Sequence, residues 1–436
     1  MAFSSPPFSL LFLFIPLFAA ITHATVPPSK TFTYINQGPF GDYNIEYGAN
    51  YRVLDTFTYP FRLCFYNTTP NAYTLALRMG ARPSESVMRW VWEANRANPV
   101  RENATLSFRR DGNLVLSDAD GRVAWQTGTA NKGVVGLQLL PNGNLVLHNQ
   151  QGRFLWQSFD HPTDTLLVGQ ALRSRGPTKL VSRVSNMDGS DGPYSFVLEA
   201  KRIAMYFKDP SSSVTLLYDT LLDTDQGPYS QVAFDSVPET AAGLAYEFGL
   251  ETKVGNTSNG LQILGLTKYN STTSYLRLGT DGNLRINTLY DKASWRLWEV
   301  TFTLFSRDSL QSECSLPRKC GSFGLCEEDQ CVACPSPKGL LGWSSGCAPP
   351  PKLGPCNGRS KVDYYKVVGV EHFMSRFSEG DGPMKVGDCR DKCSKDCKCV
   401  GFFYREESSK CLLAPMLGTL TKVSNSSHVG FIKVSK

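Results

Sequence analysis

The sequence has few of the features that mark a membrane protein or an enzyme. After residue 24, no stretch reaches the roughly 18 apolar residues that a membrane-spanning helix needs. A Gly-x-Ser-x-Gly elbow, a phosphate-binding loop and a His-Glu-x-x-His motif are all missing. Only four histidines follow the N-terminal segment, and none is paired with a Ser or Cys motif: His148, His161, His372 and His428. We therefore expect no enzymatic activity, no cofactor and no metal site.

Dense basic blocks and long amphipathic helices are also missing. The net charge of +6 is spread along 436 residues, so at most a weak attraction to acidic polysaccharide is expected. The first 300 residues contain no long amphipathic helix. The composition therefore favours a mainly β chain that is long enough for several domains. Nucleic-acid binding is disfavoured by the exported compartment that the N-terminus predicts.

The N-terminus has the pattern of a signal peptide. An apolar run from Phe8 to Ile21 is followed by Thr22-His23-Ala24, and its length is short for a membrane span. Cleavage after Ala24 would leave a secreted chain, and its polar C-terminus, Lys433 to Lys436, predicts no membrane anchor. Asn-x-Ser/Thr sequons follow, and several of them in an exported chain predict N-glycosylation. These sequons are at Asn67, Asn103, Asn256, Asn270 and Asn425.

Twelve of the 13 cysteines lie between Cys314 and Cys411. Cys-x-Cys can bind zinc, but export and an even number favour disulfides. The cysteines of this region are Cys314, Cys320, Cys326, Cys331, Cys334, Cys347, Cys356, Cys389, Cys393, Cys397, Cys399 and Cys411. Cys389, Cys393 and Cys397 are four residues apart, which is typical of one stripe on a helix, with Asp388 as a candidate N-cap. Cys64 stands alone, either as a buried small apolar residue or as one half of an intermolecular bridge.

One pattern occurs twice between Leu106 and Ser158, with a spacing of 31 residues. Each copy has a strand, an Asp/Asn-Gly-Asn turn, a Leu-Val-Leu strand, a Gly turn and a Trp-bearing strand. Asp-Gly and Asn-Gly between apolar runs are strong hairpin signals. Because such a unit cannot bury its own apolar face, the copies should stack with their Trp side chains in a shared core.

Further strands surround these two copies. The alternation in Phe61 to Tyr66 predicts a strand with one buried and one exposed face. The segment 89–100, RWVWEANRANPV, is a divergent first copy, because Trp92 precedes Trp125 by 33 residues. Short strands continue from 178 to 300, where Asp281-Gly282-Asn283 and the pair Trp295 and Trp298 repeat the pattern. A second, more divergent β unit is therefore expected.

The segment 155–167, LWQSFDHPTDTLL, invites a catalytic or metal-binding interpretation through Asp160, His161 and Asp164. A turn is the simpler interpretation, because Pro fixes φ and aspartates cap nearby amides. We favour the turn.

These motifs resemble the bulb-type (monocot mannose-binding) lectin domain of plant S-locus glycoproteins and S-domain receptor kinases. The cysteines resemble a short EGF-like stretch followed by a PAN/apple module, in the same order as in those ectodomains. Without a kinase, the chain is most similar to the epidermis-specific secreted glycoproteins of plants, also described as curculin-like or apple-domain lectins. The resemblance implies tandem β-prisms with pseudo-three-fold symmetry, and a PAN module of one sheet crossed by one helix. It also implies the disulfides Cys389–Cys411 and Cys393–Cys399, while the other pairings stay open.

The expected organisation follows from the motifs and the resemblance together. It consists of a signal peptide (1–24), a lead-in (25–44), a bulb-type lectin domain (45–160), a second lectin-like β domain (161–305), an EGF-like segment with a Pro linker (306–355) and a PAN/apple domain (356–436).

The mannose site of the family has the form Gln-x-Asp-x-Asn-x-Val-x-Tyr, in which polar groups bind sugar hydroxyls and Val packs on the ring. Three positions correspond to it here. They are Arg109, Asp111, Asn113, Val115 and Ser117; then Leu140, Asn142, Asn144, Val146 and His148; then Gly279, Asp281, Asn283, Arg285 and Asn287. The Gln and Tyr positions are changed in all three, so binding of free mannose should be weak or absent. A structural hairpin turn is the favoured interpretation of the Asp/Asn-Gly-Asn core, with residual sugar contact as the alternative. The candidates for that contact are Asp111, Asn113, Val115, Asn142, Asn144 and Val146, and the first site is the best of them because it keeps Asp, Asn and Val.

Two functional hypotheses remain. The first is a secreted, lectin-like glycoprotein that binds glycans or glycoproteins of the apoplast and cell wall. The second is a structural or protein-interaction glycoprotein of the cell wall that has lost sugar binding and contacts proteins through the PAN module. The sequence fixes neither the ligand nor the oligomeric state.

Overall fold

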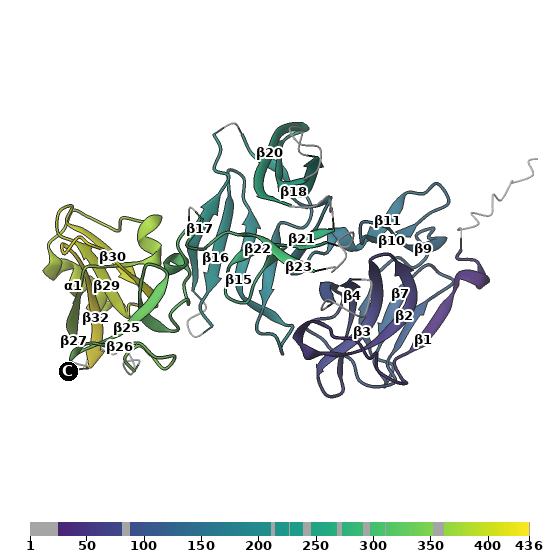
Figure 1. Cartoon of the computed structure of the whole chain (residues 1–436), viewed down its shortest axis with the longest axis horizontal. Helices are drawn as coiled ribbons and strands as arrows, with labels where there is room; N and C mark the ends of the chain where they lie inside the picture. The colour runs from purple at the N-terminus through teal and green to yellow at the C-terminus, as the bar shows by residue number, and fades with distance from the viewer. Residues whose placement is uncertain are drawn as a thin grey trace, which may run out of the picture.

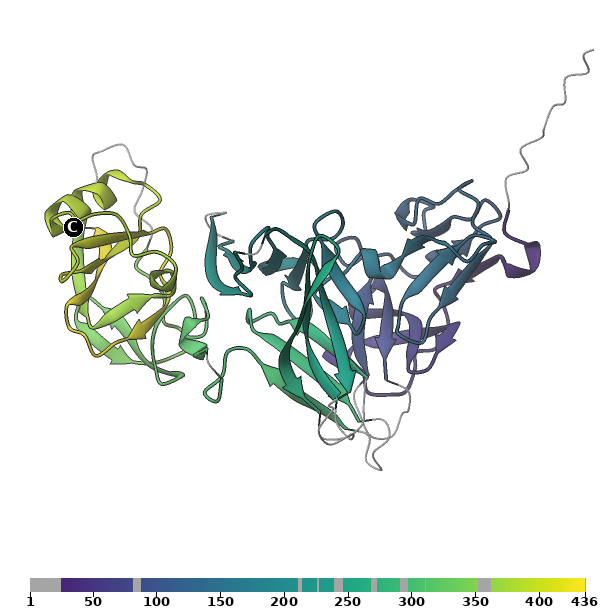
Figure 2. The ribbon, with the colours of Figure 1, turned by 90° about the horizontal axis from the view of Figure 1, so that it is seen from above.

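The structure is a computed structural model that describes residues 25–80, 88–210, 214–225, 227–238, 246–267, 273–290, 297–309, 311–351 and 362–435. Two β units and a C-terminal unit follow one another along the longest axis (Figures 1 and 2). The expected signal peptide (1–24), Asn270, Trp295 and Cys356 lie outside the described residues. Within the described part of the chain, no helix is long and apolar enough to cross a membrane.

The first unit is built from three antiparallel sheets, drawn in purple and blue in Figure 1. Sheet one has the order β1 (Phe32–Ile35), β6 (Thr105–Phe108), β7 (Leu114–Ser117), β8 (Val123–Gln126). Sheet two has the order β2 (Asn50–Thr58), β3 (Phe61–Thr69), β4 (Ala72–Met79), β5 (Arg89–Glu93). Sheet three consists of β9 (Gly136–Leu139), β10 (Leu145–His148) and β11 (Phe154–Gln157).

The inner faces of these sheets meet in one apolar core. Each sheet contributes one tryptophan, and Trp92, Trp125 and Trp156 contact one another edge to face, with ring centroids 5.7–6.0 Å apart. Edge-to-face contact is favourable because the positive ring edge meets the negative ring face. The predicted stacking of three Trp-bearing copies is therefore confirmed.

Two details of this unit differ from the sequence-based expectations. The lead-in (25–44) is part of the prism, because β1 pairs with β6 and completes sheet one. The alternation in β3 does not separate a buried face from an exposed face. Cys64 and Tyr66, on the face predicted to be exposed, are buried together with Trp90. Ile45, Met88 and Trp90 of the same unit pack with them, and Arg183 of the second unit also donates a hydrogen bond to the Tyr66 hydroxyl.

The second unit repeats the three-sheet plan around its own core. Its first sheet has the order β12 (Thr165–Leu167), β21 (Ser274–Leu278), β22 (Leu284–Leu289), β23 (Trp298–Thr303). The next has the order β13 (Gln170–Arg173), β18 (Tyr229–Pro238), β19 (Tyr246–Val254), β20 (Thr257–Leu266). The last runs from β14 (Lys179–Arg183) through β15 (Asp191–Leu198) and β16 (Ile203–Lys208) to β17 (Thr215–Leu221). The fold is therefore mainly β with tandem lectin-like prisms, as predicted.

The described residues of the C-terminal unit form two sheets and one α-helix, α1 (Val386–Lys395). One sheet has the order β26 (Gly339–Gly342), β25 (Gln330–Ser336), β24 (Phe323–Glu327), β31 (Gly418–Lys422), β28 (Val370–His372). The other has the order β27 (Val362–Val368), β32 (His428–Ser435), β29 (Gly401–Arg405), β30 (Lys410–Ala414). Because β24 and β31 pair in parallel, the segments expected to be EGF-like and PAN/apple share one sheet and one core.

Helix α1 corrects two expectations. Lys385 occupies the N-cap position and Asp388 lies in the first turn, where a carboxylate still interacts favourably with the positive helix end. Cys397 lies beyond the last residue of the helix, so only Cys389 and Cys393 share its buried stripe.

Candidate functional site

The three Asp/Asn-Gly-Asn turns have the same geometry. In each, the first side chain accepts a hydrogen bond from the backbone N–H two residues on: Asp111 Oδ1 from Asn113 at 2.9 Å, Asn142 Oδ1 from Asn144 at 3.1 Å, and Asp281 Oδ1 from Asn283 at 3.0 Å. The central glycines have φ of 81–86°, a left-handed conformation that favours glycine. The motif is therefore a turn device in both prisms.

The asparagine at the third position of each motif is buried. It is hydrogen-bonded to residues at the end of the Trp-bearing strand or just after it. Asn113 donates to Gln126 Oε1 at 2.9 Å and accepts from the Thr127 hydroxyl and the Thr129 N–H. Asn144 repeats this arrangement with Gln157 Oε1 at 2.8 Å, the Ser158 hydroxyl and the Phe159 N–H. Both amide groups are thus committed to the fold.

Asn283 serves the same purpose in the second prism. Its side chain donates to the Phe305 carbonyl at 2.8 Å and accepts from the Phe305 N–H at 3.1 Å. Three asparagines in equivalent turns therefore fasten a hairpin to the strand that follows, and none offers a free amide to a ligand.

The other candidate positions differ in accessibility. Val115 and Val146 are buried, so their methyl groups are not available to a sugar ring. At the position of the family tyrosine, His148 lies against Gly136, whose added Cβ would meet its Nε2 at 2.6 Å. Asp111 is half-buried and Asn142 is exposed. Of the six candidates, only these two remain available at the surface.

The third position is occupied by the chain itself. Arg285 stands where the family has valine and forms a bidentate ion pair with Asp281, with N–O distances of 3.0 and 2.6 Å. A sugar hydroxyl would have to displace a charge-assisted pair, which is stronger than a neutral hydrogen bond. This position is therefore not a credible sugar site.

The segment 155–167 is a structural connection between the prisms. The His161 carbonyl accepts a hydrogen bond from Trp92 Nε1 at 2.9 Å. The imidazole ring of His161 stacks on Trp156, with ring centroids 5.4 Å apart. Asp160 pairs with Arg173 at 3.2 Å, and the buried Asp164 accepts from the Thr165 hydroxyl at 2.8 Å. Each group that invited a catalytic interpretation thus has a structural partner.

A buried charge cluster between the prisms was missed by the sequence analysis. Arg183 Nη1 of β14 lies 2.5 Å from Glu93 Oε1 of β5, and Tyr66 also donates to Glu93. Arg277 of β21 pairs with Glu46 at 2.6 Å and donates to the Trp90 carbonyl. Burial raises the pKa of the Tyr66 hydroxyl, an effect that neighbouring Glu93 reinforces. The available signal was Glu93, a carboxylate at the end of the apolar segment Trp90-Val91-Trp92.

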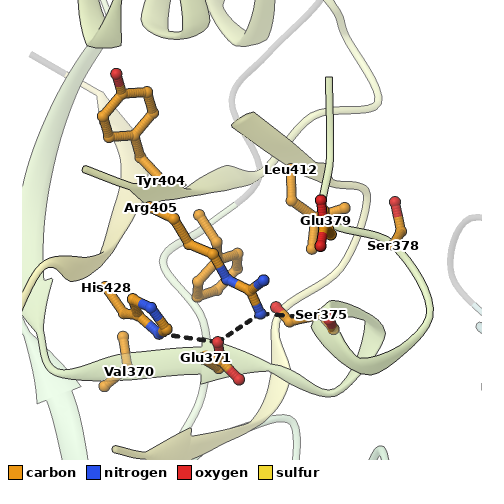
Figure 3. Close-up of a pocket in the computed structure, with 10 residues that line it drawn as sticks. Val370, Glu371, Ser375, Ser378, Glu379, Tyr404, Arg405, Leu412 and His428 are labelled. Carbon is orange, nitrogen blue, oxygen red and sulfur yellow. Dashed lines mark hydrogen bonds and ion pairs between the residues drawn. The ribbon is translucent and has the colours of Figure 1, made fainter. Parts of the chain in front are cut away.

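A second cluster lies in the C-terminal unit (Figure 3). Arg405 and His428 both point toward Glu371, with N–O distances of 2.6 and 2.8 Å, and His428 Nε2 lies 2.7 Å from Glu407. The adjoining cavity has about 10 Å³, room for about one water molecule. The ion pairs of this cluster connect neighbouring strands. The cavity beside them is too small to hold an organic ligand.

A larger groove of about 540 Å³ separates the two prisms. The first prism contributes Arg96, Trp125 and Gln126 to its lining, and the connection contributes His161. The second prism contributes Lys179 and Asp191. This volume lies within the usual range of small-ligand sites, about 300–1,000 Å³.

The cysteines form a disulfide framework in the C-terminal unit. Disulfides join Cys389 to Cys411 and Cys393 to Cys399, the pairs that the resemblance implies. The remaining described bridges are Cys314–Cys326, Cys320–Cys331 and Cys334–Cys347. Cys397 is also disulfide-bonded. Cys64 is free and buried, and burial raises the pKa of its thiol to about 12.

Two family profiles match the chain. The D-mannose binding lectin family matches residues 89–186, and the S-locus glycoprotein domain matches residues 225–342. The first match includes all six candidate sugar-contact residues, and the second ends in the cysteine-rich segment. These matches confirm the expected relation to bulb-type lectins and S-locus glycoproteins.

Curated relatives resemble the chain over most of its length. It is 52% identical to EP1-like glycoprotein 2 of Arabidopsis thaliana, over 95% of this chain and 96% of that protein. It is also 52% identical to the epidermis-specific secreted glycoprotein EP1 of Daucus carota, over 80% of this chain and 93% of that protein. A G-type lectin S-receptor-like serine/threonine-protein kinase of Arabidopsis thaliana is 26% identical, over 79% of this chain and 39% of that protein.

Proposed function

The chain belongs to the EP1-like glycoprotein family, and we propose on that basis that it is a secreted protein that binds carbohydrates or glycoproteins of the apoplast and cell wall. One observation carries the proposal. The first hairpin holds Asp111 at the surface with one carboxylate oxygen bonded to the turn, and the other oxygen, Oδ2, has no partner among the described residues. Asn142 presents its side chain at the equivalent exposed position. These two groups can accept hydrogen bonds from sugar hydroxyls.

Binding at these hairpins is weak in this proposal. Asn113, Asn144, Val115 and Val146 are committed to the fold, so each hairpin offers one polar group of the four in the family motif. Each missing neutral hydrogen bond costs about 1 kcal/mol. Extended or multivalent glycans, which contact both hairpins or several chains, are therefore favoured over free mannose.

A glycan array probed with the secreted, folded protein tests the proposal. Binding above background to some glycans is expected, and Asp111→Ala should reduce it more than Arg110→Ala, a nearby exposed control. A silent array, with intact folding verified by circular dichroism, would contradict the proposal.

A protein-interaction role is the second candidate. It is favoured because Asn113 and Asn144 are hydrogen-bonded within the fold and are not available to a sugar. The C-terminal unit also exposes Leu340, Leu341 and Trp343 near its edge strand β26. Pull-down of apoplastic proteins before and after enzymatic deglycosylation separates the candidates. Capture that is lost on deglycosylation supports the lectin, and capture that persists supports protein contacts.

The four described sequon asparagines differ in exposure. Asn103, Asn256 and Asn425 are exposed, whereas Asn67 on β3 is only 4% exposed. We propose that the first three carry glycans and that Asn67 does not, because its side chain lies inside a four-stranded sheet. Peptide mapping after enzymatic glycan release should show conversion to Asp at 103, 256 and 425, and conversion at 67 would contradict the assignment.

A further inference from the structure

The groove between the prisms combines aromatic surface with polar groups. Trp125 is half-buried, and the exposed His161 ring lies parallel to Trp156 at an interplanar angle of 16°. Such rings offer flat apolar faces, against which the C–H face of a pyranose can pack. Partial desolvation lowers the pKa of His161 and so favours its neutral form.

Arg96 is an unusual feature of the lining. Its side chain is 6% exposed, and Nη2 donates to the Val181 carbonyl at 3.2 Å and the Ser182 carbonyl at 2.6 Å. Its buried Nη1 has no hydrogen-bond partner among the described residues. Arg96 therefore joins the first prism to β14 and shapes the wall of the groove, while this nitrogen stays inside the wall.

The charges of the lining balance one another. Arg96 and Lys179 are positive, and Glu93 and Asp191 are negative. Arg96 Nη2 lies 3.6 Å from Asp191 Oδ1, whose side chain is 70% exposed. A groove with no net charge has no electrostatic preference for an anion, whereas hydroxyl groups, which both donate and accept, suit both signs of charge.

The groove is held in shape by contacts from both prisms. The Glu93–Arg183 ion pair and the Trp92–His161 hydrogen bond fix its walls relative to each other. A preformed site loses little entropy when a ligand binds, which favours measurable affinity from few contacts.

We propose that this inter-prism groove is a binding site for a neutral oligosaccharide, separate from the hairpins at Asp111 and Asn142. The proposal rests on the carbohydrate-binding function proposed above, and it adds a location and a ligand class. One sugar ring packs against Trp125 and His161. Its hydroxyl groups bind Lys179 and the Asp191 carboxylate.

Isothermal titration calorimetry on the full glycosylated chain tests the proposal. The probes are cellotetraose, mannotetraose and a xyloglucan heptasaccharide, with trigalacturonate as the anionic comparison. At least one neutral probe should bind, and it should change the fluorescence of Trp125. The double variant Lys179→Ala/Asp191→Ala, which keeps the net charge, should weaken binding about tenfold. Lys201→Ala/Asp225→Ala, at exposed positions of the same prism outside the groove lining, is the matched control and should have no effect.

The outcomes separate the groove from the hairpins. Binding that survives Lys179→Ala/Asp191→Ala but is lost with Asp111→Ala/Asn142→Ala overturns the groove and leaves the proposed function standing. Tighter binding of trigalacturonate than of every neutral probe overturns the ligand class. An array and calorimetry without any binding overturn both proposals. Loss with the groove variant alone, at an unchanged unfolding temperature, supports the groove.

Discussion

At the scale of single residues, the motif asparagines show how one residue type can mark a lectin and still serve the fold. Asn113, Asn144 and Asn283 occupy equivalent turns, and each bonds to the chain that leaves the following strand. Their amides satisfy buried backbone and side-chain groups that would otherwise lose water without compensation. The motif can therefore persist after the residues at its ends have changed.

We predict that Asn113→Ala destabilises the first prism by about 2–3 kcal/mol. The change leaves the buried Thr129 N–H without its acceptor and removes the bond to Gln126. Urea unfolding followed by tryptophan fluorescence measures the effect. Arg109→Ala, at an exposed position of the same turn, should change stability by less than about 0.5 kcal/mol. Equal effects of the two changes would contradict this assignment.

His372 predicts a pH dependence in the C-terminal unit. Its Nε2 lies 3.1 Å from the Met416 carbonyl, and its Nδ1 accepts from the Met374 N–H, so the neutral ring is preferred. Burial lowers its pKa to about 4. The unfolded chain takes up a proton near pH 6.5. The stability from this group is therefore complete above pH 6.5 and is lost as the pH falls toward 4, by about 3 kcal/mol.

Urea unfolding at pH 7 and pH 4.5 tests this dependence on the wild type and on His372→Gln. The wild type should lose more stability on acidification than the variant, because glutamine cannot take up the proton. Identical pH profiles would show that the pKa of His372 is the same in the folded and the unfolded chain.

At the scale of elements, the periodicity of the sequence predicted where strands form, but it did not predict which of their faces are buried. β3 was expected to expose one face, yet Cys64 and Tyr66 are buried, because Ile45, Met88 and Trp90 pack with them and Arg183 of the second prism contacts Tyr66. Helix α1 was expected from cysteine spacing, and it ends before Cys397. Local pattern determines which element forms, but the neighbours that cover it come from distant sequence.

The disulfide between Cys389 and Cys411 connects α1 to β30, 22 residues later. We predict that Cys389→Ala/Cys411→Ala destabilises the C-terminal unit by about 2–5 kcal/mol, because the unfolded chain regains freedom and packing is lost. Differential scanning calorimetry should show a lower unfolding temperature for this unit, with the transition of the first prism unchanged. A shift of both transitions would show that the units unfold together.

At the scale of the whole molecule, the two prisms behave as one block because charged pairs are buried between them. Glu93–Arg183 and Glu46–Arg277 each join one prism to the other. Breaking a buried pair leaves one charge without compensation, which costs far more than breaking a pair at the surface. The groove between the prisms depends on this fixed arrangement.

Glu93→Gln should therefore destabilise the prism pair by about 3–5 kcal/mol, because Arg183 stays buried without its counter-charge. Glu327→Gln, which breaks the exposed pair with Lys422, is the control and should cost less than about 1 kcal/mol. Thermal unfolding measures both, and small-angle X-ray scattering reports whether the prisms separate. Equal small effects would show that the Glu93 pair is dispensable.

The sequence alone determined the repeated hairpins, the Trp-bearing strands, the cysteine-rich C-terminal unit and the loss of the family's Gln and Tyr. These features depend on local rules, such as glycine in the left-handed turn and alternation along a strand. Only the tertiary structure decided that Asn113 and Asn144 are bonded to the fold, that Cys64 and Tyr66 are buried, and that a groove lies between the prisms. Those properties arise from contacts between separate strands and between the two prisms, which the pattern within one strand does not record.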